Sequence, residues 1–230
     1  MNVQRTMCLV FALAFPTLVS ATALGAETAV KLPTPKYQGT MSVEQAIIAR
    51  KSTRSFKPAA LTLAEISQVL WAADGKLPAD ALAGPTRKVV PSAGGLYPLE
   101  VFLLTGERTV ENLPAGLYKY DSSKNSLALV APGDKRTALA QGAYGQMGFA
   151  RAPAILVIAA VFERTTMKYR DQGIGFVYME AGYATQNVCL QAEAVGLHSW
   201  IIGAFVPSKV MADLQLPSGT APLALVGIGK

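Results

Sequence analysis

The run Arg50-Lys51-Ser52-Thr53-Arg54 places two guanidinium groups on either side of a hydroxyl group. Each guanidinium group can donate two parallel hydrogen bonds to phosphate oxygens, so Arg50, Ser52 and Arg54 are candidates for a phosphate site. The same run also fits a solvated helix end, because basic residues are common in the last turn of a helix. The run alone does not decide between these two interpretations.

A second candidate region consists mainly of small residues. Consecutive small residues allow backbone N–H groups to approach a flat ring or an anion, which a Cβ atom would prevent. An ordinary glycine turn explains the same pattern. The region reads Pro91-Ser92-Ala93-Gly94-Gly95-Leu96-Tyr97-Pro98. Close backbone approach is also expected at Gly203, after an apolar strand, and at the chain end Gly227-Ile228-Gly229-Lys230.

Few other residues suggest chemistry. Lys168 and Tyr169 stand among further basic residues, in a segment that also fits a solvated loop. The single histidine, His198, is expected to be packed or hydrogen-bonded rather than catalytic. With one histidine and no cysteine cluster, a metal site is not expected. Removal of the N-terminal segment with Cys8 would leave only Cys189, so no internal disulfide is expected.

The composition favours one folded domain. The chain has 230 residues, of which 51% are hydrophobic and 16% charged, which argues against disorder. The net charge of +6 and the pI near 9.3 could attract nucleic acid, an anionic membrane or a phosphate-bearing ligand. No dense basic stripe with interleaved aromatic residues is present in the sequence, so nucleic acid is not an expected partner.

The N-terminus resembles an export signal. Arg5 precedes an apolar stretch over residues 7–19, and small residues follow through residue 26. As a helix this stretch would be about 20 Å long, shorter than the ~30 Å hydrocarbon core of a membrane. We therefore expect a cleaved signal peptide over residues 1–26, export to the periplasm, and no stable membrane span in the mature chain. An uncleaved anchor is the alternative, because residues 6–26 carry no charge.

The rest of the chain predicts an α+β fold. A lead over residues 27–41 precedes a single domain over residues 42–230. Ser42 with Gln45, and Thr62 with Glu65, read as capping boxes at the start of two helices. Periodicity predicts helices over residues 42–51, 62–73, 135–148 and 176–195, and strands over 101–104, 116–120, 126–130, 154–161, 199–202 and 223–228. The order predicts a central, mostly antiparallel sheet flanked by helices.

The predicted helix over residues 176–195 is apolar around most of its circumference, and Gly196 closes it. Such a helix is buried on several sides, and a homodimer seam would bury it. Its main apolar stripe is Val177, Ala181, Ala184, Val188 and Ala192; Met179, Gly182, Cys189 and Leu190 extend it. A narrow polar stripe of Glu180, Tyr183, Asn187 and Gln191 fits buried hydrogen bonding, a wet groove or direct chemistry.

Four segments in order resemble the nitroreductase family, over essentially the whole chain from residue 42 to residue 230. The run from Arg50 to Phe56 resembles the opening flavin motif of that family. Residues 91–98 resemble the flavin loop of one branch, the thiazole/oxazole-forming dehydrogenases, as do residues 180–187 with the following 190–197. Lys168-Tyr169 resembles a Lys-Tyr pair of the members that oxidise azoline rings in peptides.

The resemblance implies a homodimer with flavin mononucleotide (FMN) at the subunit interface. By position, Arg50, Ser52 and Arg54 would bind the phosphate and ribityl oxygens, and Lys230 would approach the phosphate. Lys51 would lie near the phosphate or the pyrimidine edge of the ring. The ring would be lined by Ser92, Ala93, Gly94, Gly95 and Leu96, and Gly203 would face N5 through its backbone. Lys168 and Tyr169 would act as base and acid in an oxidation, as the resemblance implies.

The export signal departs from the family pattern. The azoline-forming members act with partner enzymes inside cells, and nicotinamide donors are scarce outside the cytoplasm. Three hypotheses therefore remain open. The chain is an FMN-dependent oxidoreductase of the cell envelope with an unknown donor or acceptor, such as a quinone. It is a dehydrogenase of a peptide or small molecule that uses Lys168 and Tyr169, or it is a non-catalytic flavin or ligand carrier.

Overall fold

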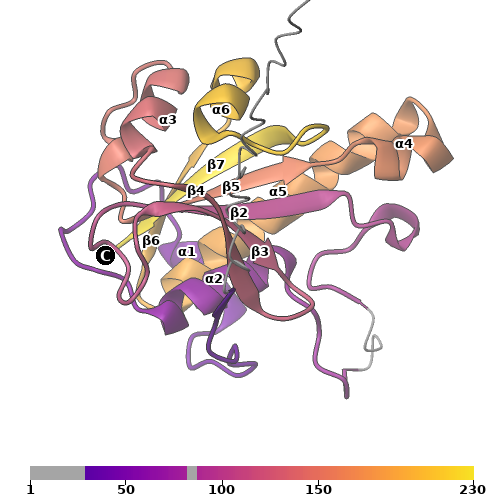
Figure 1. Ribbon diagram of the computed structural model, residues 1–230. Helices are drawn as coiled ribbons and strands as arrows, with labels where there is room; N and C mark the ends of the chain where they lie inside the picture. The colour runs from indigo at the N-terminus through magenta and orange to yellow at the C-terminus, as the bar shows by residue number, and fades with distance from the viewer. Residues whose placement is uncertain (1–28, 82–86) are drawn as a thin grey trace, which may run out of the picture.

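The computed structural model describes residues 29–81 and 87–230. The predicted signal peptide, residues 1–26, lies outside the described residues. The described chain is built around one seven-stranded sheet with the order β1-β4-β3-β2-β5-β7-β6, in which all neighbouring strands are antiparallel (Figure 1). The strands are β1 (Val30–Lys31), β2 (Leu99–Thr105), β3 (Gly116–Asp121), β4 (Ser126–Pro132), β5 (Ala154–Ala160), β6 (His198–Ile202) and β7 (Ala221–Gly229).

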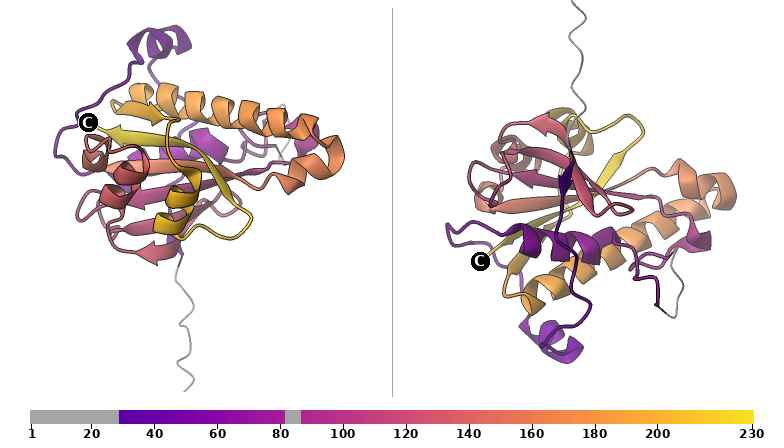
Figure 2. Two further views of the ribbon diagram at one scale, coloured as in Figure 1. Left: turned by 90° about the horizontal axis from the view of Figure 1, so that it is seen from above. Right: turned by 60° about the horizontal axis from the view of Figure 1, so that its bottom comes forward.

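Helices cover both faces of this sheet (Figure 2). Helices α2 (Leu63–Asp74) and α5 (Gln172–Ala194) pack on one face, and α3 (Arg136–Gly142) and α6 (Pro207–Leu214) pack on the other. Strand β2 shows why two cores form: Val101 and Leu103 belong to the first, while Phe102 and Leu104 belong to the second. Alternate side chains of a strand point to opposite faces, so one apolar strand serves both cores. The predicted α+β fold with an antiparallel sheet is confirmed.

Both predicted capping boxes are present. Ser42 and Gln45 exchange side-chain to backbone hydrogen bonds at the start of α1 (Val43–Ala49). Thr62 and Glu65 do the same at the start of α2. Each box satisfies two backbone N–H groups that have no partner within the helix, which fixes where the helix begins.

Two predictions about the helices need correction, and two short elements were not predicted. The helix expected over residues 135–148 ends at Gly142, because Tyr144 and Gly145 both adopt positive φ and turn the chain into a 3₁₀ turn, η2 (Phe149–Arg151). The segment around Lys168 is a helix, α4 (Glu163–Tyr169), where a charged loop was expected. Neither β1 nor α6 was predicted, because they are only two and eight residues long and short elements show little periodicity.

Helix α5 begins at Gln172, four residues earlier than predicted. Its main apolar stripe is buried as expected, but the opposite side is exposed in the single chain. That exposed side carries Ile174, Tyr178, Met179 and Tyr183. Within residues 29–81 and 87–230, none of the helices is both long enough and apolar enough to cross a membrane.

Candidate functional site

The basic run lies beside the ends of β6 and β7. Ser52 forms a parallel bridge with Ser199, and the Thr53 N–H donates to the Ser199 carbonyl oxygen at 2.9 Å. The Lys57 N–H donates to the carbonyl oxygen of Lys230 at 2.7 Å. The run after α1 therefore adds a short segment to the edge of the sheet, where Lys51, Ser52 and Arg54 remain exposed.

The two arginines of the run lie beside different elements, Arg54 beside β6 and Arg50 beside α5. The Arg54 guanidinium group lies over the Trp200 ring, 5.7 Å from its centroid, and Trp200 in turn packs edge-on against Phe149. Such a cation–π contact orients a guanidinium group without using its hydrogen-bond donors. Arg50 lies near Cys189 on α5: burial raises the pKa of the Cys189 thiol, and the charge of Arg50 acts in the opposite direction.

Gly203 and Lys230 complete this group. Gly203 directly follows β6, is exposed, and has no atom within 4 Å of the place where a Cβ would lie. The Lys230 ammonium group donates to the Ala60 carbonyl oxygen and pairs with Glu65, each at 3.2 Å. Glu65 is a partner that the sequence did not suggest. We call Arg50, Lys51, Ser52, Arg54, Gly203 and Lys230 the basic half-site.

The small-residue region forms a 3₁₀ turn, η1 (Ala93–Gly95), that is anchored to α5. The Ser92 hydroxyl and the Ala93 N–H both donate to one carboxylate oxygen of Glu180 at 2.9 Å. Burial raises the pKa of Glu180, and these two hydrogen bonds oppose the rise. Glu180 is therefore a buried hydrogen-bond acceptor. This was one of the three roles that the sequence allowed for the polar stripe.

Lys168 and Tyr169, which we call the Lys–Tyr pair, lie against this turn. A Cβ atom added to Gly94 would lie 2.8 Å from the Tyr169 hydroxyl oxygen and 3.0 Å from the Lys168 ammonium nitrogen. Tyr169 packs edge-on against Phe176 at the start of α5, and Lys168 lies over the Tyr169 ring. Two segments that the sequence singled out separately are thus in contact. We call residues Ser92–Leu96 and the Lys–Tyr pair the turn half-site.

This contact predicts different costs for two neighbouring glycines. Gly94 and Gly95 both have positive φ, 62° and 66°, but only Gly94 has neighbours within 4 Å of a Cβ position. Gly95→Ala is expected to lower the free energy of unfolding by about 1–2 kcal/mol, the cost of the left-handed conformation. Gly94→Ala should lower it by about 1 kcal/mol more, because its Cβ would also crowd the Tyr169 hydroxyl group, which must shift. Urea unfolding of both variants measures the difference, and equal losses would contradict this packing.

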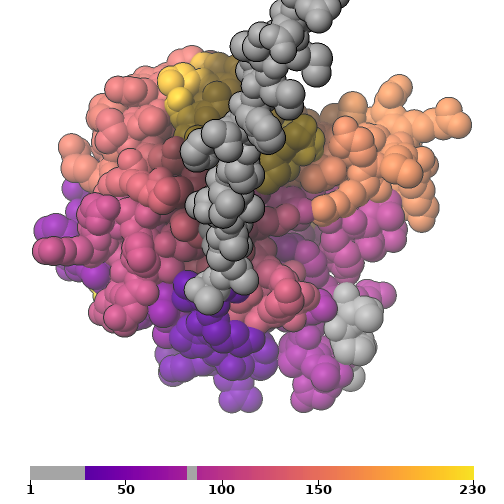
Figure 3. Space-filling view, viewed as in Figure 1, coloured from indigo at the N-terminus to yellow at the C-terminus, as the bar shows by residue number. Residues whose placement is uncertain are grey.

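The two half-sites lie at opposite ends of α5 within one chain. Glu180 holds the turn half-site and Cys189 lies beside the basic one, so about 14 Å of helix axis separates the two supports. In the left view of Figure 2, the C-terminus lies toward one end of α5 and α4 lies at the other. In the space-filling view, α4 projects from one side of the molecule (Figure 3).

A pocket of about 770 Å³ lies apart from both half-sites, between the lead, α1, α2 and the C-terminal half of α5. Asn187 and Gln191 of the predicted polar stripe line it, so this part of the stripe faces a groove. None of the predicted site residues lines this pocket. His198, also outside the half-sites, has its Nδ1 3.3 Å from Glu193, as expected for a hydrogen-bonded histidine.

Most of the chain is similar to known proteins. Residues 47–230 match the model of the nitroreductase family. The Methanocaldococcus jannaschii protein MJ1384, named as a nitroreductase, is 36% identical over 190 residues, covering 83% of this chain and 91% of that protein. The microcin B17-processing protein McbC of Escherichia coli is 32% identical over 152 residues, 64% of this chain and 55% of McbC.

A solved structure is also similar. In the E. coli microcin synthetase complex McbBCD with truncated pro-MccB17 bound, one chain superposes with a TM-score of 0.67 at 26% identity. The superposition covers 96% of this chain and 84% of that one.

Proposed function

Because this chain belongs to the nitroreductase family, in its McbC-like branch, we propose that it is an FMN-dependent oxidoreductase acting in the cell envelope. The proposal rests most on one observation: the segments that resemble flavin motifs gather into two groups at the ends of a single helix. Segments that resembled these motifs only by chance would not be expected to cluster in space.

The donor set of the basic half-site fits a phosphate. Arg50 and Arg54 supply guanidinium groups and Ser52 a hydroxyl group, all beside an exposed sheet edge. Past that edge, Gly203 leaves space at its Cβ position for a flat ring to approach its backbone. In this proposal, FMN supplies hydride transfer at N5 when bound. The chain's own residues bind its phosphate, line its ring and exclude water.

A second copy of the chain would bring the half-sites together. The exposed side of α5 is apolar between the two half-sites, and α1 exposes Val43, Ile47 and Ile48 while it stands away from the body in Figure 2. A two-fold axis near Tyr183, the middle residue of α5, would place the basic half-site of one copy beside the turn half-site of the other. The groove next to α1 would then receive apolar side chains of the second copy. This supports a homodimer with the flavin between the subunits.

Replacing Tyr183 with glutamate tests this arrangement. Two unpaired charges would be buried at the axis, so we expect dimerisation to weaken by about 100-fold or more and bound FMN to be lost with it. Tyr144→Glu, at an exposed tyrosine after α3, is the matched control and should leave both unchanged. Light scattering and flavin absorbance measure the two effects. A Tyr183→Glu protein that stays dimeric with full flavin would contradict the proposed interface.

A second candidate function is favoured by the contact between Gly94 and the Lys–Tyr pair. Oxidation of an azoline ring removes a hydride and a proton, and the proton needs an acceptor. Lys168 and Tyr169 place an amine and a phenol together at the turn half-site, where they could hold or move that proton. The similarity to a chain of McbBCD, which was solved with a truncated precursor peptide bound, supports a peptide substrate and partner proteins for this candidate.

An anaerobic titration separates these functions from a flavin carrier. The purified protein loaded with FMN is mixed with NADH, NADPH or a quinol, and flavin absorbance is followed. An oxidoreductase of the envelope is expected to be bleached by at least one donor and to recover its colour with oxygen. A loaded protein that no donor reduces, and that oxidises no thiazoline-bearing peptide, would leave the carrier hypothesis and refute the proposal.

A further inference from the structure

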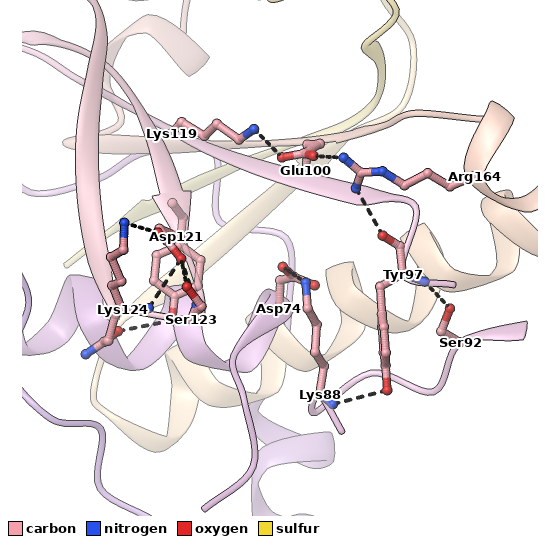
Figure 4. Close-up of polar contacts among 12 residues, drawn as sticks. Asp74, Lys88, Ser92, Tyr97, Glu100, Lys119, Asp121, Ser123, Lys124 and Arg164 are labelled. Carbon is pink, nitrogen blue, oxygen red and sulfur yellow. Dashed lines mark hydrogen bonds and ion pairs between the residues drawn. The ribbon is translucent and has the colours of Figure 1, made fainter. Parts of the chain in front are cut away.

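A buried ion pair joins the end of α2 to the segment before the turn half-site (Figure 4). Asp74 is the last residue of α2, and the Lys88 ammonium nitrogen lies 2.6 Å from its carboxylate. Both side chains are largely buried, with 9% of Asp74 and 16% of Lys88 exposed. Next to this ion pair, the Val89 N–H donates to the Gly75 carbonyl oxygen at 2.9 Å. The backbone after α2 and the backbone before the turn half-site are therefore held together at this point.

Lys88 contacts Tyr97 in two ways. Its ammonium group lies 5.4 Å from the centroid of the Tyr97 ring, and its backbone N–H donates to the Tyr97 hydroxyl oxygen at 3.4 Å. Tyr97 has a φ of 46°, a conformation that residues other than glycine rarely adopt. Its N–H donates to the Ser92 hydroxyl oxygen at 2.8 Å, and its carbonyl oxygen accepts from Arg164 at 3.2 Å. These contacts with Lys88, Ser92 and Arg164 therefore hold Tyr97 in an unfavourable conformation.

Tyr97 and Ser92 close the turn that carries Gly94. The hydrogen bond between Tyr97 and Ser92 spans the turn, and the remaining bonds within it are short-range: Gly95 N–H to Ser92 and Leu96 N–H to Ala93. Gly94 in turn lies against the Lys–Tyr pair. A displacement of Tyr97 would therefore move the surface on which that pair rests.

We propose that Asp74 and Lys88 are positioning residues, which fix Tyr97 and so hold Gly94 against the Lys–Tyr pair. This role rests on the proposed function of the turn half-site in the reaction. The alternative is a pair that only stabilises the end of α2. The contacts of Lys88 favour positioning, because both its backbone and its side chain touch Tyr97.

The proposed role has a pH limit. Four charged or titratable groups lie near the Asp74 carboxyl group. They are Lys88, which precedes the turn half-site, Glu100 of β2, Tyr120 of β3 and Arg164 of α4. Burial raises the pKa of Asp74 to about 6, although Lys88 acts against the rise. Burial also acts on Glu100, but its two cationic neighbours hold its pKa below the usual range. Below pH about 6 the Asp74 carboxyl group is therefore neutral and Lys88 loses its ion-pair partner, although the Glu180 carboxylate still attracts it; residues 92–97 should then loosen.

Hydrogen–deuterium exchange of residues 91–98, corrected for intrinsic exchange rates, tests this without flavin or turnover. At about pH 7.5 the unaltered protein should protect this peptide, and at about pH 5 the peptide should exchange about tenfold faster. Asp74→Asn and Lys88→Met should show the fast rate at both pH values. Lys88→Arg, which keeps the charge, should restore protection at the higher pH. Lys76→Met, at an exposed lysine bridged to Lys88, is the matched control and should follow the unaltered protein.

Two results would overturn the proposal. Burial also raises the pKa of Glu180, so acid loosening that persists unchanged in Asp74→Asn would assign the effect to Glu180. Loss of protection in Asp74→Asn with unchanged turnover of a flavin-loaded protein would show that the pair does not position the reaction. The expected result is a kcat about tenfold lower with KM unchanged. If the protein turns nothing over, the proposed function fails while the exchange data still test how the turn is held.

Discussion

Replacing Arg50 and Arg54 together with glutamine is expected to raise the dissociation constant for FMN by about 100-fold to 10,000-fold. Hydrogen bonds to charged groups contribute about 1.5–3 kcal/mol each, and tenfold in affinity corresponds to about 1.4 kcal/mol. Arg54 is exposed, Arg50 is half-buried, and neither belongs to an apolar core, so the double variant should fold normally. Titration of the protein with FMN, followed by fluorescence quenching, gives the two constants.

Two controls make this result specific to phosphate. Lys57→Gln removes a charge from the same exposed segment but from outside the basic half-site, and its affinity for FMN should change little. Riboflavin lacks the phosphate but keeps the ribityl chain, so the double substitution should weaken riboflavin binding far less than FMN binding. If the double variant keeps FMN at full occupancy, Arg50 and Arg54 do not bind the phosphate.

Replacing Lys168 with methionine and Tyr169 with phenylalanine should lower the oxidation of a thiazoline-bearing peptide by about 100-fold to 10,000-fold. That range is typical for the loss of general acid–base catalysis. The flavin content should remain that of the unaltered protein, because neither side chain belongs to the basic half-site. The measurement is product formation with oxygen as the electron acceptor, alongside the visible absorbance of the same samples.

The neighbouring Met167 provides a control for this experiment. It is the most exposed large apolar side chain on α4, at 87%, so Met167→Ala alters the same helix without touching Gly94. Turnover of Met167→Ala should match that of the unaltered protein. Unchanged turnover in the Lys–Tyr double variant would remove the dehydrogenase candidate but would leave flavin binding as proposed.

The sequence predicted those features of the fold that depend on short-range patterns. Ser42 with Gln45 is one example, because a capping box requires only residues three positions apart. The short apolar run of β2 is another, since a run of this length is typical of a strand buried on both faces. Helix α4 was missed because its charged residues resemble those of a solvated loop, and packing against α5 makes it a helix.

The partners in the candidate site could not be predicted in the same way. The contact between Gly94 and Tyr169 joins residues that are far apart in the sequence, and neither residue carries a signal that identifies the other. The same holds for Lys230 with Glu65 and for Asp74 with Lys88. Glu180 carried a usable signal, since a carboxylate within an otherwise apolar helix requires a hydrogen-bond donor.

Titration of purified residues 27–230 with FMN, followed by the visible spectrum, tests whether this chain binds FMN through its phosphate and ring. We expect saturation at one FMN per chain, a shift in the flavin absorption bands, and binding of riboflavin that is about 100-fold weaker. A protein that takes up no FMN, or that binds FMN and riboflavin with equal affinity, would contradict the proposed binding.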